Sequence, residues 1–302
     1  MASVLDEVEP GGSVAVVRLR SLGDSVLTTP ALRILKRARP DVRVAVMVED
    51  PFRAIFEDQP DTDVILPPRL DALRKLRAAV CLNLHGGSRS AWMTVASGAR
   101  RRVGFGHYRM QWAYDLHVPR AQEILGEERT VHTAEHLASA MFWLGAPRCK
   151  IPRASLGSHA LPTSTSVAVI HPFAATPAKT WPAEGFRAVA GHLEHSGMEV
   201  VVIGGADDDF TPFAAWRTMR GAILGQVKDL LAGAALFVGN DSGPAHMAAA
   251  FGLPVLAIFG ASNPAIWGPW RTQSRVVTAP DGIASVSVDQ VLEALARLGV
   301  RV

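Results

Sequence analysis

Seven short runs of apolar, mostly β-branched residues constrain the fold more than any other feature of this chain. They are continuous rather than alternating, which is typical of parallel strands buried on both faces. Helical patterns lie between several of them, for example at residues 185–197. Strands that alternate with helices predict βαβ units, parallel sheets and an α/β fold. The runs are residues 13–19, 43–49, 79–84, 166–172, 199–205, 235–240 and 254–260.

The domain organisation follows from length and from one stretch of biased composition. A chain of 302 residues is too long for one small core and fits two domains. Residues 150–166, KIPRASLGSHALPTSTS, are rich in Pro, Ser, Thr and Gly, which is typical of a linker. We therefore expect an N-terminal domain over residues 1–155 and a C-terminal domain over 156–302. The amphipathic pattern at 286–298 predicts a final helix, which could pack back on the N-terminal domain.

The charge is modest and sits mainly in the first half. The net charge is +3, and residues 1–150 carry 21 Lys and Arg against 17 Asp and Glu. Arg100, Arg101, Arg102 and Arg109 lie close together in sequence and form either a solvated face or a binding region. An anionic acceptor or a membrane surface fits this region better than nucleic acid, because no long basic run or aromatic stacking motif accompanies it.

The termini and cysteines indicate a cytoplasmic protein. The first residues, MASVLDEVEPGG, are acidic and lack the cationic flank and apolar stretch of a signal peptide. No apolar run approaches the roughly 20 residues of a membrane span. Cys81 and Cys149 are too few and too far apart for a zinc site or a disulfide framework. We expect a soluble cytoplasmic protein without metal or cofactor, which could also work at the inner face of the membrane.

The first candidate site follows the first strand, because ligands of open α/β sheets bind at the carboxyl ends of strands. Leu22, Gly23 and Asp24 stand there. Gly23 permits a tight turn or a close backbone approach. Asp24 is either an N-cap of the following helix or a general base toward a hydroxyl group.

The second candidate site follows the run at 235–240. Asp241, Ser242 and Gly243 precede a helix that begins near Pro244. The N–H groups of Ser242 and Gly243, together with the helix dipole, predict a site for an anion. His246, one turn later, either binds a phosphate or fills the core.

Two further loops follow strands of the second half. Lys179 is the cation of the loop after residues 166–172, where it could hold a diphosphate and stabilise a leaving group. Trp181 is expected to be a packing anchor. The acidic run at 207–209 follows the run at 199–205 and either binds ribose hydroxyls or begins a solvated helix.

These motifs, in this order, resemble glycosyltransferase family 9, the heptosyltransferases of lipopolysaccharide core synthesis. The matching stretches are VVRLRSLGDSVLTTPALRILK, LHGGSRSA, GARRRVGF, HPFAATPAKTWP, VVIGG and VGNDSGPAHMAAAFGLPVLAIFG, which together span nearly the whole chain. The resemblance implies the GT-B fold, in which two Rossmann-like domains face a cleft. The acceptor would bind the N-terminal domain and a nucleotide-diphosphate sugar the C-terminal domain.

The resemblance also implies an activity and assigns roles to residues. It implies a metal-independent, inverting glycosyltransferase that moves a sugar, expected to be a heptose from an ADP-activated donor, to an acceptor hydroxyl. The general base falls on Asp24 and the diphosphate-binding cation on Lys179. The remaining assignments are the nucleotide-sugar residues Asp241, Ser242, Gly243, His246 and Asp208, with Asp207 and Asp209 competing for the ribose, and the acceptor residues Arg18, Gly23 and His85.

Other functions stay open on the sequence alone. The acceptor could be an anionic glycolipid or a small-molecule natural product. A sugar-nucleotide epimerase on the same scaffold would use the donor without an acceptor. A nucleotide-binding protein without activity would bind a nucleoside diphosphate and transfer nothing.

Overall fold

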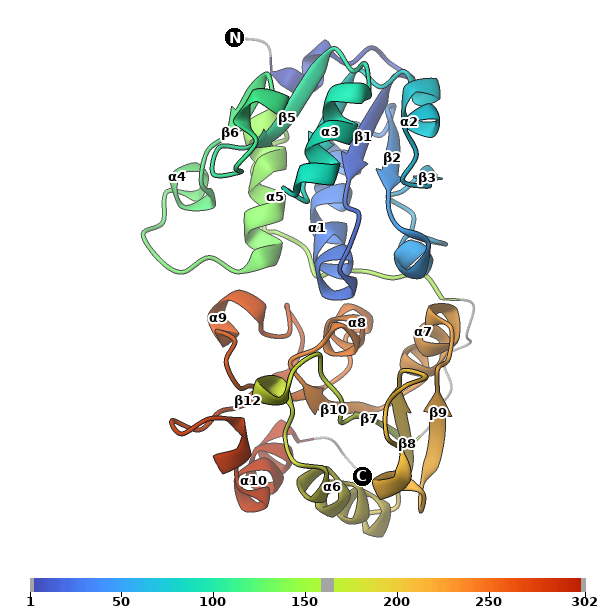
Figure 1. The fold of residues 1–302 in the computed structure, drawn as a ribbon. Coiled ribbons are helices and arrows are strands. Elements are labelled where there is room, and N and C mark those ends of the chain that lie inside the picture. The colour runs from blue at the N-terminus through green and yellow to red at the C-terminus, as the bar shows by residue number, and fades with distance from the viewer. Residues whose placement is uncertain (1–2, 159–165, 300–302) are drawn as a thin grey trace. The chain divides into compact units, whose positions relative to one another are not determined.

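Two six-stranded parallel sheets, one in each half of the chain, organise the protein (Figure 1). The computed structural model describes residues 3–158 and 166–299. The chain divides into two compact units, Met1–Gly157 and Ser158–Val302. The division falls inside the predicted linker, of which residues 159–165 lie outside the described part of the chain.

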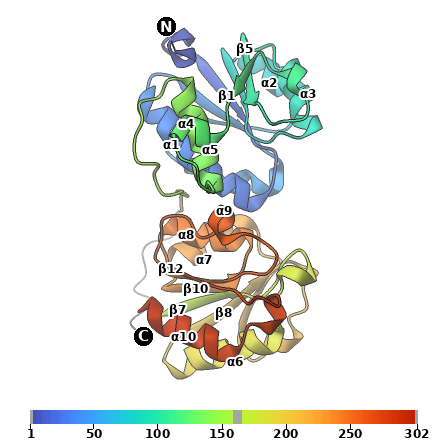
Figure 2. The same cartoon turned by 90° about the vertical axis from the view of Figure 1, so that its left-hand side faces the viewer.

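The N-terminal sheet has the strand order β3-β2-β1-β4-β5-β6, and all neighbouring strands are parallel. Helices α1 and α5 pack against each other on one face, and α2 and α3 cover the opposite face (Figures 1 and 2). The strands are β1 (Ser13–Val17), β2 (Arg43–Met47), β3 (Val64–Leu66), β4 (Val80–Asn83), β5 (Arg101–Phe105) and β6 (Leu116–Val118). The helices are α1 (Leu22–Ala38), α2 (Leu70–Leu76), α3 (Ser88–Ala96), α4 (Ala121–Leu125) and α5 (Thr133–Leu144), with 3₁₀ turns η1 (Val4–Glu7), η2 (Asp50–Ile55) and η3 (Gln111–Ala113).

The C-terminal sheet has the order β12-β11-β10-β7-β8-β9 and is also parallel throughout. Counted along each half, both sheets therefore follow the order 3-2-1-4-5-6 of a Rossmann-like fold. The strands are β7 (Val167–His171), β8 (Glu199–Gly204), β9 (Arg217–Arg220), β10 (Leu236–Asn240), β11 (Val255–Ile258) and β12 (Ser274–Val277). The helices are α6 (Ala183–His195), α7 (Leu224–Ala232), α8 (Gly243–Phe251), α9 (Pro264–Trp267) and α10 (Val288–Leu298), with 3₁₀ turns η4 (Pro177–Lys179), η5 (Thr211–Phe213) and η6 (Ile283–Ser285).

All seven strands predicted from the apolar runs are present, as β1, β2, β4, β7, β8, β10 and β11. The prediction missed the four edge strands β3, β6, β9 and β12, and β5 beside one edge. Edge strands are short and partly exposed, so they need no continuous apolar run. Strand β5 was missed because it opens with two arginines before its buried residues.

The final helix belongs to the C-terminal unit. Val291, Leu295 and Leu298 of α10 are buried in the same core cluster as strands β7, β10 and β11. The helix also packs against α6 (Figure 2). The apolar stripe of the helix is therefore covered by the sheet of its own unit.

The basic region at 100–109 is not one continuous patch. Arg101 pairs with Glu7, with its Nε 2.7 Å from a carboxylate oxygen, and Arg102 pairs with Asp115. Both arginines lie in β5 and are partly buried, and a carboxylate of the same unit balances the charge of each. Arg100 and Arg109 are exposed. In the described residues, no helix is both long and apolar enough to cross a bilayer.

Candidate active site

The predicted site residues cluster where the strand order of each sheet reverses. In such sheets the loops on either side of the reversal diverge, which opens a place for a ligand at the carboxyl ends of the strands. The reversal lies between β1 and β4 in the N-terminal unit and between β7 and β10 in the C-terminal unit. Arg18 and Asp24 follow β1, His85 follows β4, Lys179 follows β7, and Asp241, Ser242 and Gly243 follow β10.

Asp24 lies in the first turn of α1 rather than at its N-cap, which is Ser21. The Ser21 hydroxyl donates to Asp24 Oδ2 over 3.1 Å, and a guanidinium nitrogen of Arg18 lies 3.9 Å from the same oxygen. The carboxylate is still 26% exposed, so a hydroxyl group could approach it. Gly23 is part of the helix and has no positive φ, so of the two roles left open for this glycine, a tight turn or a close backbone approach, the structure excludes the tight turn.

Arg18 joins the ends of two strands. Its side chain is 5% exposed and donates to the carbonyl oxygen of Leu84, directly after β4, besides lying near Asp24. A buried guanidinium in this position fixes Asp24 relative to the loop that carries His85. The geometry therefore favours a positioning role over the direct acceptor contact expected from the sequence.

His85 presents a neutral imidazole. Its Nδ1 lies 3.1 Å from the carbonyl oxygen of Arg20, and because a carbonyl only accepts, Nδ1 carries the proton. Burial, followed by the charge of Arg18, lowers the His85 pKa, so the ring is uncharged at neutral pH and Nε2 is a hydrogen-bond acceptor. Asn83 holds this loop, since its Oδ1 accepts from the N–H groups of His85 (2.9 Å) and Gly86 (3.0 Å).

An aromatic cluster beside this loop was not foreseen. The Tyr108 ring packs against Gly86, where an added Cβ would come within 2.5 Å of it. The His136 ring stacks on Phe105 with a centroid distance of 4.0 Å, and burial lowers the His136 pKa to about 4. Phe105 and Tyr108 are close in sequence, but His136 comes from α5, so only the fold brings its ring to Phe105.

In the C-terminal unit, Lys179 and Asp241 form an ion pair. The Lys179 Nζ lies 2.9 Å from Asp241 Oδ2, and the two side chains are 36% and 7% exposed. Ser242 is the N-cap of α8 and Gly243 begins it. Pro244 has no N–H group and the Ala245 N–H donates to the Ser242 carbonyl over 3.2 Å, so the N–H groups without an acceptor in the helix are those of Ser242 and Gly243. A partly exposed cation and the positive end of a nine-residue helix thus stand together, which suits a diphosphate.

His171 and Asp208 extend this site. His171 Nδ1 lies 3.1 Å from the Ser242 hydroxyl, and burial lowers the His171 pKa to about 4, with Asp208 acting in the opposite direction. Asp208 Oδ2 accepts from the Gly205 N–H over 2.7 Å and is half-buried. Asp207 and Asp209 are exposed, and among the three acids Asp208 is the one whose charge acts on His171. The acids lie in a turn, not at the start of a helix.

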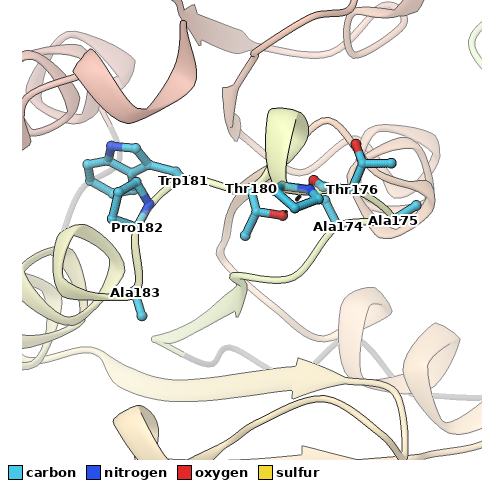
Figure 3. Close-up of a pocket in the computed structure, with 8 residues that line it drawn as sticks. Ala174, Ala175, Thr176, Thr180, Trp181, Pro182 and Ala183 are labelled. Carbon is cyan, nitrogen blue, oxygen red and sulfur yellow. Dashed lines mark hydrogen bonds between the residues drawn. The ribbon is translucent and has the colours of Figure 1, made fainter.

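Asn240, to which the sequence assigned no role, connects the two loops of this site. It is fully buried, donates to the Pro172 carbonyl over 2.8 Å and accepts from the Trp181 N–H over 3.0 Å. Trp181 is 1% exposed and its indole nitrogen donates to the Val286 carbonyl, as expected of a packing anchor. The loop after β7, between Pro172 and Trp181, lines a pocket of about 410 Å³. Within this loop the Thr180 hydroxyl donates to the Thr176 carbonyl over 2.9 Å (Figure 3).

His246 is buried. It lies one turn into α8 and is 5% exposed, which favours the packing role left open by the sequence. Within residues 3–158 and 166–299, no group of three or more His, Cys, Asp and Glu residues could hold a metal ion.

Gly260 provides a test of how Lys179 is placed. A Cβ at Gly260 would lie 2.0 Å from the carbonyl oxygen of Ala178, next to Lys179. Because the sequence predicts that Lys179 holds a diphosphate, we expect Gly260→Ala to displace this turn and weaken the binding of a nucleoside diphosphate about tenfold, measured by calorimetry, by the same physics that makes overpacking costly. Gly225→Ala is the matched control, because nothing lies within 4 Å of its Cβ position. Equal affinity of the two variants for the nucleoside diphosphate would contradict this placement.

Comparison with known proteins agrees with the arrangement. Lipopolysaccharide heptosyltransferase 3 of Escherichia coli (strain K12) is 26% identical over 291 residues, covering 83% of each chain. A solved glycosyl transferase family 9 structure from Veillonella parvula DSM 2008 has a TM-score of 0.83 at 21% identity, covering 96% of this chain and 98% of that one. The E. coli heptosyltransferase WaaC with ADP has a TM-score of 0.80 at 20% identity, covering 95% and 99%.

The solved structures share the two-domain GT-B fold, in agreement with the fold expected from the sequence. A family model described as glycosyltransferase family 9 (heptosyltransferase) matches residues 69–291, well over half of the chain. The motifs, the two Rossmann-like units and this match lead to the same assignment. The chain belongs to glycosyltransferase family 9, the heptosyltransferases.

Proposed function

We propose that this glycosyltransferase transfers a heptose from ADP-heptose to a hydroxyl group of a lipopolysaccharide core acceptor, with inversion and without a metal ion. The donor is supported by a solved relative that holds ADP, and the acceptor by relatives that are lipopolysaccharide heptosyltransferases. The observation that carries the proposal is that the two units hold different groups where their strand order reverses. The N-terminal unit holds a carboxylate there, and the C-terminal unit holds a cation beside a helix N-terminus.

In this mechanism Asp24 takes the proton of the acceptor hydroxyl. The hydroxyl oxygen then forms a bond to the anomeric carbon of the heptose from the face opposite ADP. The bond between that carbon and the β-phosphate oxygen breaks, and ADP leaves with the electron pair. A single displacement with one base and no covalent intermediate inverts the anomeric configuration, as in inverting glycoside hydrolysis.

The C-terminal residues stabilise the charge that develops on ADP. The Lys179 ammonium group and the N–H groups at the start of α8 are fixed donors, which is the role a metal ion plays in other phosphate chemistry. A diphosphate would compete with Asp241 for Lys179, so the ion pair keeps the cation oriented until the donor binds. Asp208 would accept from the ribose hydroxyls, and Arg18 and His85 would place Asp24 and the acceptor.

The test combines purified protein, ADP-heptose and a lipopolysaccharide core acceptor. We expect ADP release that requires the acceptor, a product anomer opposite to that of the donor by NMR, and unchanged rates in EDTA. Isomerised donor in the absence of acceptor would indicate an epimerase. Transfer to small natural products in preference to the core acceptor would show that the acceptor is a small molecule. ADP binding without transfer would reject the enzyme assignment.

A further inference from the structure

An exposed aromatic pair marks the outer face of the N-terminal unit. Trp92 of α3 is 58% exposed and Trp112 of η3 is 55% exposed. Their rings contact each other edge to face, with a centroid distance of 4.8 Å. Two indoles that shield each other yet remain in solvent bury little apolar area, so packing within the unit does not explain them. Tryptophan is the side chain most suited to a boundary between water and lipid.

The chain around this pair is one-sided in charge. Between Asp71 and Asp115 the sequence contains no acidic residue. Four of the basic residues in this interval are paired with carboxylates of the same unit, namely Lys75, Arg89, Arg101 and Arg102. The basic residues of the interval are Arg74, Lys75, Arg77, Arg89, Arg100, Arg101, Arg102 and Arg109.

Three of these arginines line a pocket next to the same helix. Arg74, Arg77 and Arg100 surround a space of about 440 Å³ where α2 and α3 end, and no carboxylate lines it. Helices α2 and α3 lie side by side on one face of the sheet, opposite α1 and α5 (Figures 1 and 2). Trp92 and the pocket are separated by about one and a half turns of α3, or roughly 8 Å. Two acidic residues of this unit are themselves paired, Asp71 with Arg69 and Glu49 with Arg89.

We propose that this face docks on a bilayer that contains anionic phospholipids. The two indoles insert at the level of the headgroups, and the arginine-lined pocket takes a headgroup phosphate. Apolar contact and electrostatic attraction together give reversible, salt-sensitive binding. We call the surface formed by the Trp92–Trp112 pair and the three pocket arginines the docking face.

Docking would bring the enzyme to a lipid-linked acceptor, and to that extent this inference rests on the proposed function. The loop that carries His85 runs directly into α3, and Gly86 of that loop packs on Tyr108, close in sequence to Trp112. A membrane bound to α3 would thus lie next to the acceptor residues. Binding to vesicles needs neither donor nor acceptor, so it is measured independently of transfer.

The experiment is vesicle co-sedimentation of the full chain without substrates. We expect binding to vesicles of phosphatidylcholine with phosphatidylglycerol, little binding to phosphatidylcholine alone, and weakening with added salt. The double variant W92S/W112S should bind at least about tenfold more weakly. The double variant R77Q/R100Q should lose roughly fivefold per arginine. The matched controls are I223S, at an exposed isoleucine of the C-terminal unit, and R187Q, at an exposed arginine of α6.

Thermal unfolding and ADP affinity establish that each variant is folded. The proposal is overturned if wild-type protein ignores anionic vesicles, if it binds neutral vesicles equally well, or if W92S/W112S binds like wild type. It is also overturned if W92S/W112S retains vesicle binding but loses transfer to a soluble acceptor, because the two indoles would then form a subsite for sugar. Sedimentation that shows a dimer lost in W92S/W112S would instead assign the face to a second copy of the chain.

Discussion

Asp24→Asn is expected to lower turnover by about 100-fold or more, the lower end for loss of a general base. The amide keeps the shape of the side chain and its contact with Ser21 but cannot take a proton. The free energy of unfolding should change by only about 1 kcal/mol, because the side chain is partly exposed and makes one hydrogen bond and one long ion pair. Steady-state ADP release and urea unfolding measure the two quantities. Asp24→Ala should behave similarly in turnover.

Two further variants make this prediction specific. Asp289→Asn is the matched control, because Asp289 is likewise in the first turn of a helix, α10, and should leave turnover unchanged. His85→Gln distinguishes the other nearby proton acceptor, since neutral His85 has an available Nε2. Near-normal turnover of Asp24→Asn with a large loss in His85→Gln would transfer the role of base to the histidine.

Lys179→Met is expected to reduce kcat/KM by about 100-fold or more, the scale seen when one fixed donor to a developing negative charge is removed. The change removes the cation beside α8 and leaves Asp241, which is 7% exposed, without its partner. Asp241→Asn should cost only about tenfold, because lysine keeps its charge and the amide oxygen can still accept from it. Steady-state kinetics and the dissociation constant of ADP measure these effects.

A second lysine–aspartate pair provides the control. Lys36 Nζ lies 2.7 Å from Asp63 Oδ2 in the N-terminal unit, away from the reversal of strand order between β1 and β4. Lys36→Met therefore removes the same kind of ion pair and should lower stability but not activity. If Asp241→Asn impairs ADP binding as severely as Lys179→Met, the carboxylate contributes to the site in its own right and the assignment of the cation is wrong.

The parts of the fold that the sequence predicted are those encoded locally. Strands such as Val167–His171 are buried on both faces, so continuous apolar runs mark them. Asp24, Lys179 and Asp241 could be selected because each follows such a strand. The parallel C-terminal sheet brings the ends of β7 and β10, and with them Lys179 and Asp241, to one edge. The edge strands left no such run, because one side of each faces solvent.

What could not be predicted depends on contacts between distant segments. Asn240 acts by bonding to residues 68 and 59 positions earlier in the chain, and the His171–Ser242 contact spans 71. Arg18 was recognised as part of the site, but its burial, and hence its positioning role, follows from packing against the end of β4. Similarly, no pattern in the sequence distinguishes Arg101, which is paired with Glu7, from the exposed Arg100.

The repetition of one strand order in both halves has a consequence for how such enzymes diversify. Each half has its own buried core and carries its own functional loops at the ends of its own strands. In the function proposed above, the first half binds the acceptor and the second half binds the activated sugar. Under that proposal, substitutions that alter which sugar chain is elongated can accumulate in the first half while recognition of the activated sugar stays intact. New linkages would then arise by modular exchange, without rebuilding the chemistry of nucleotide departure.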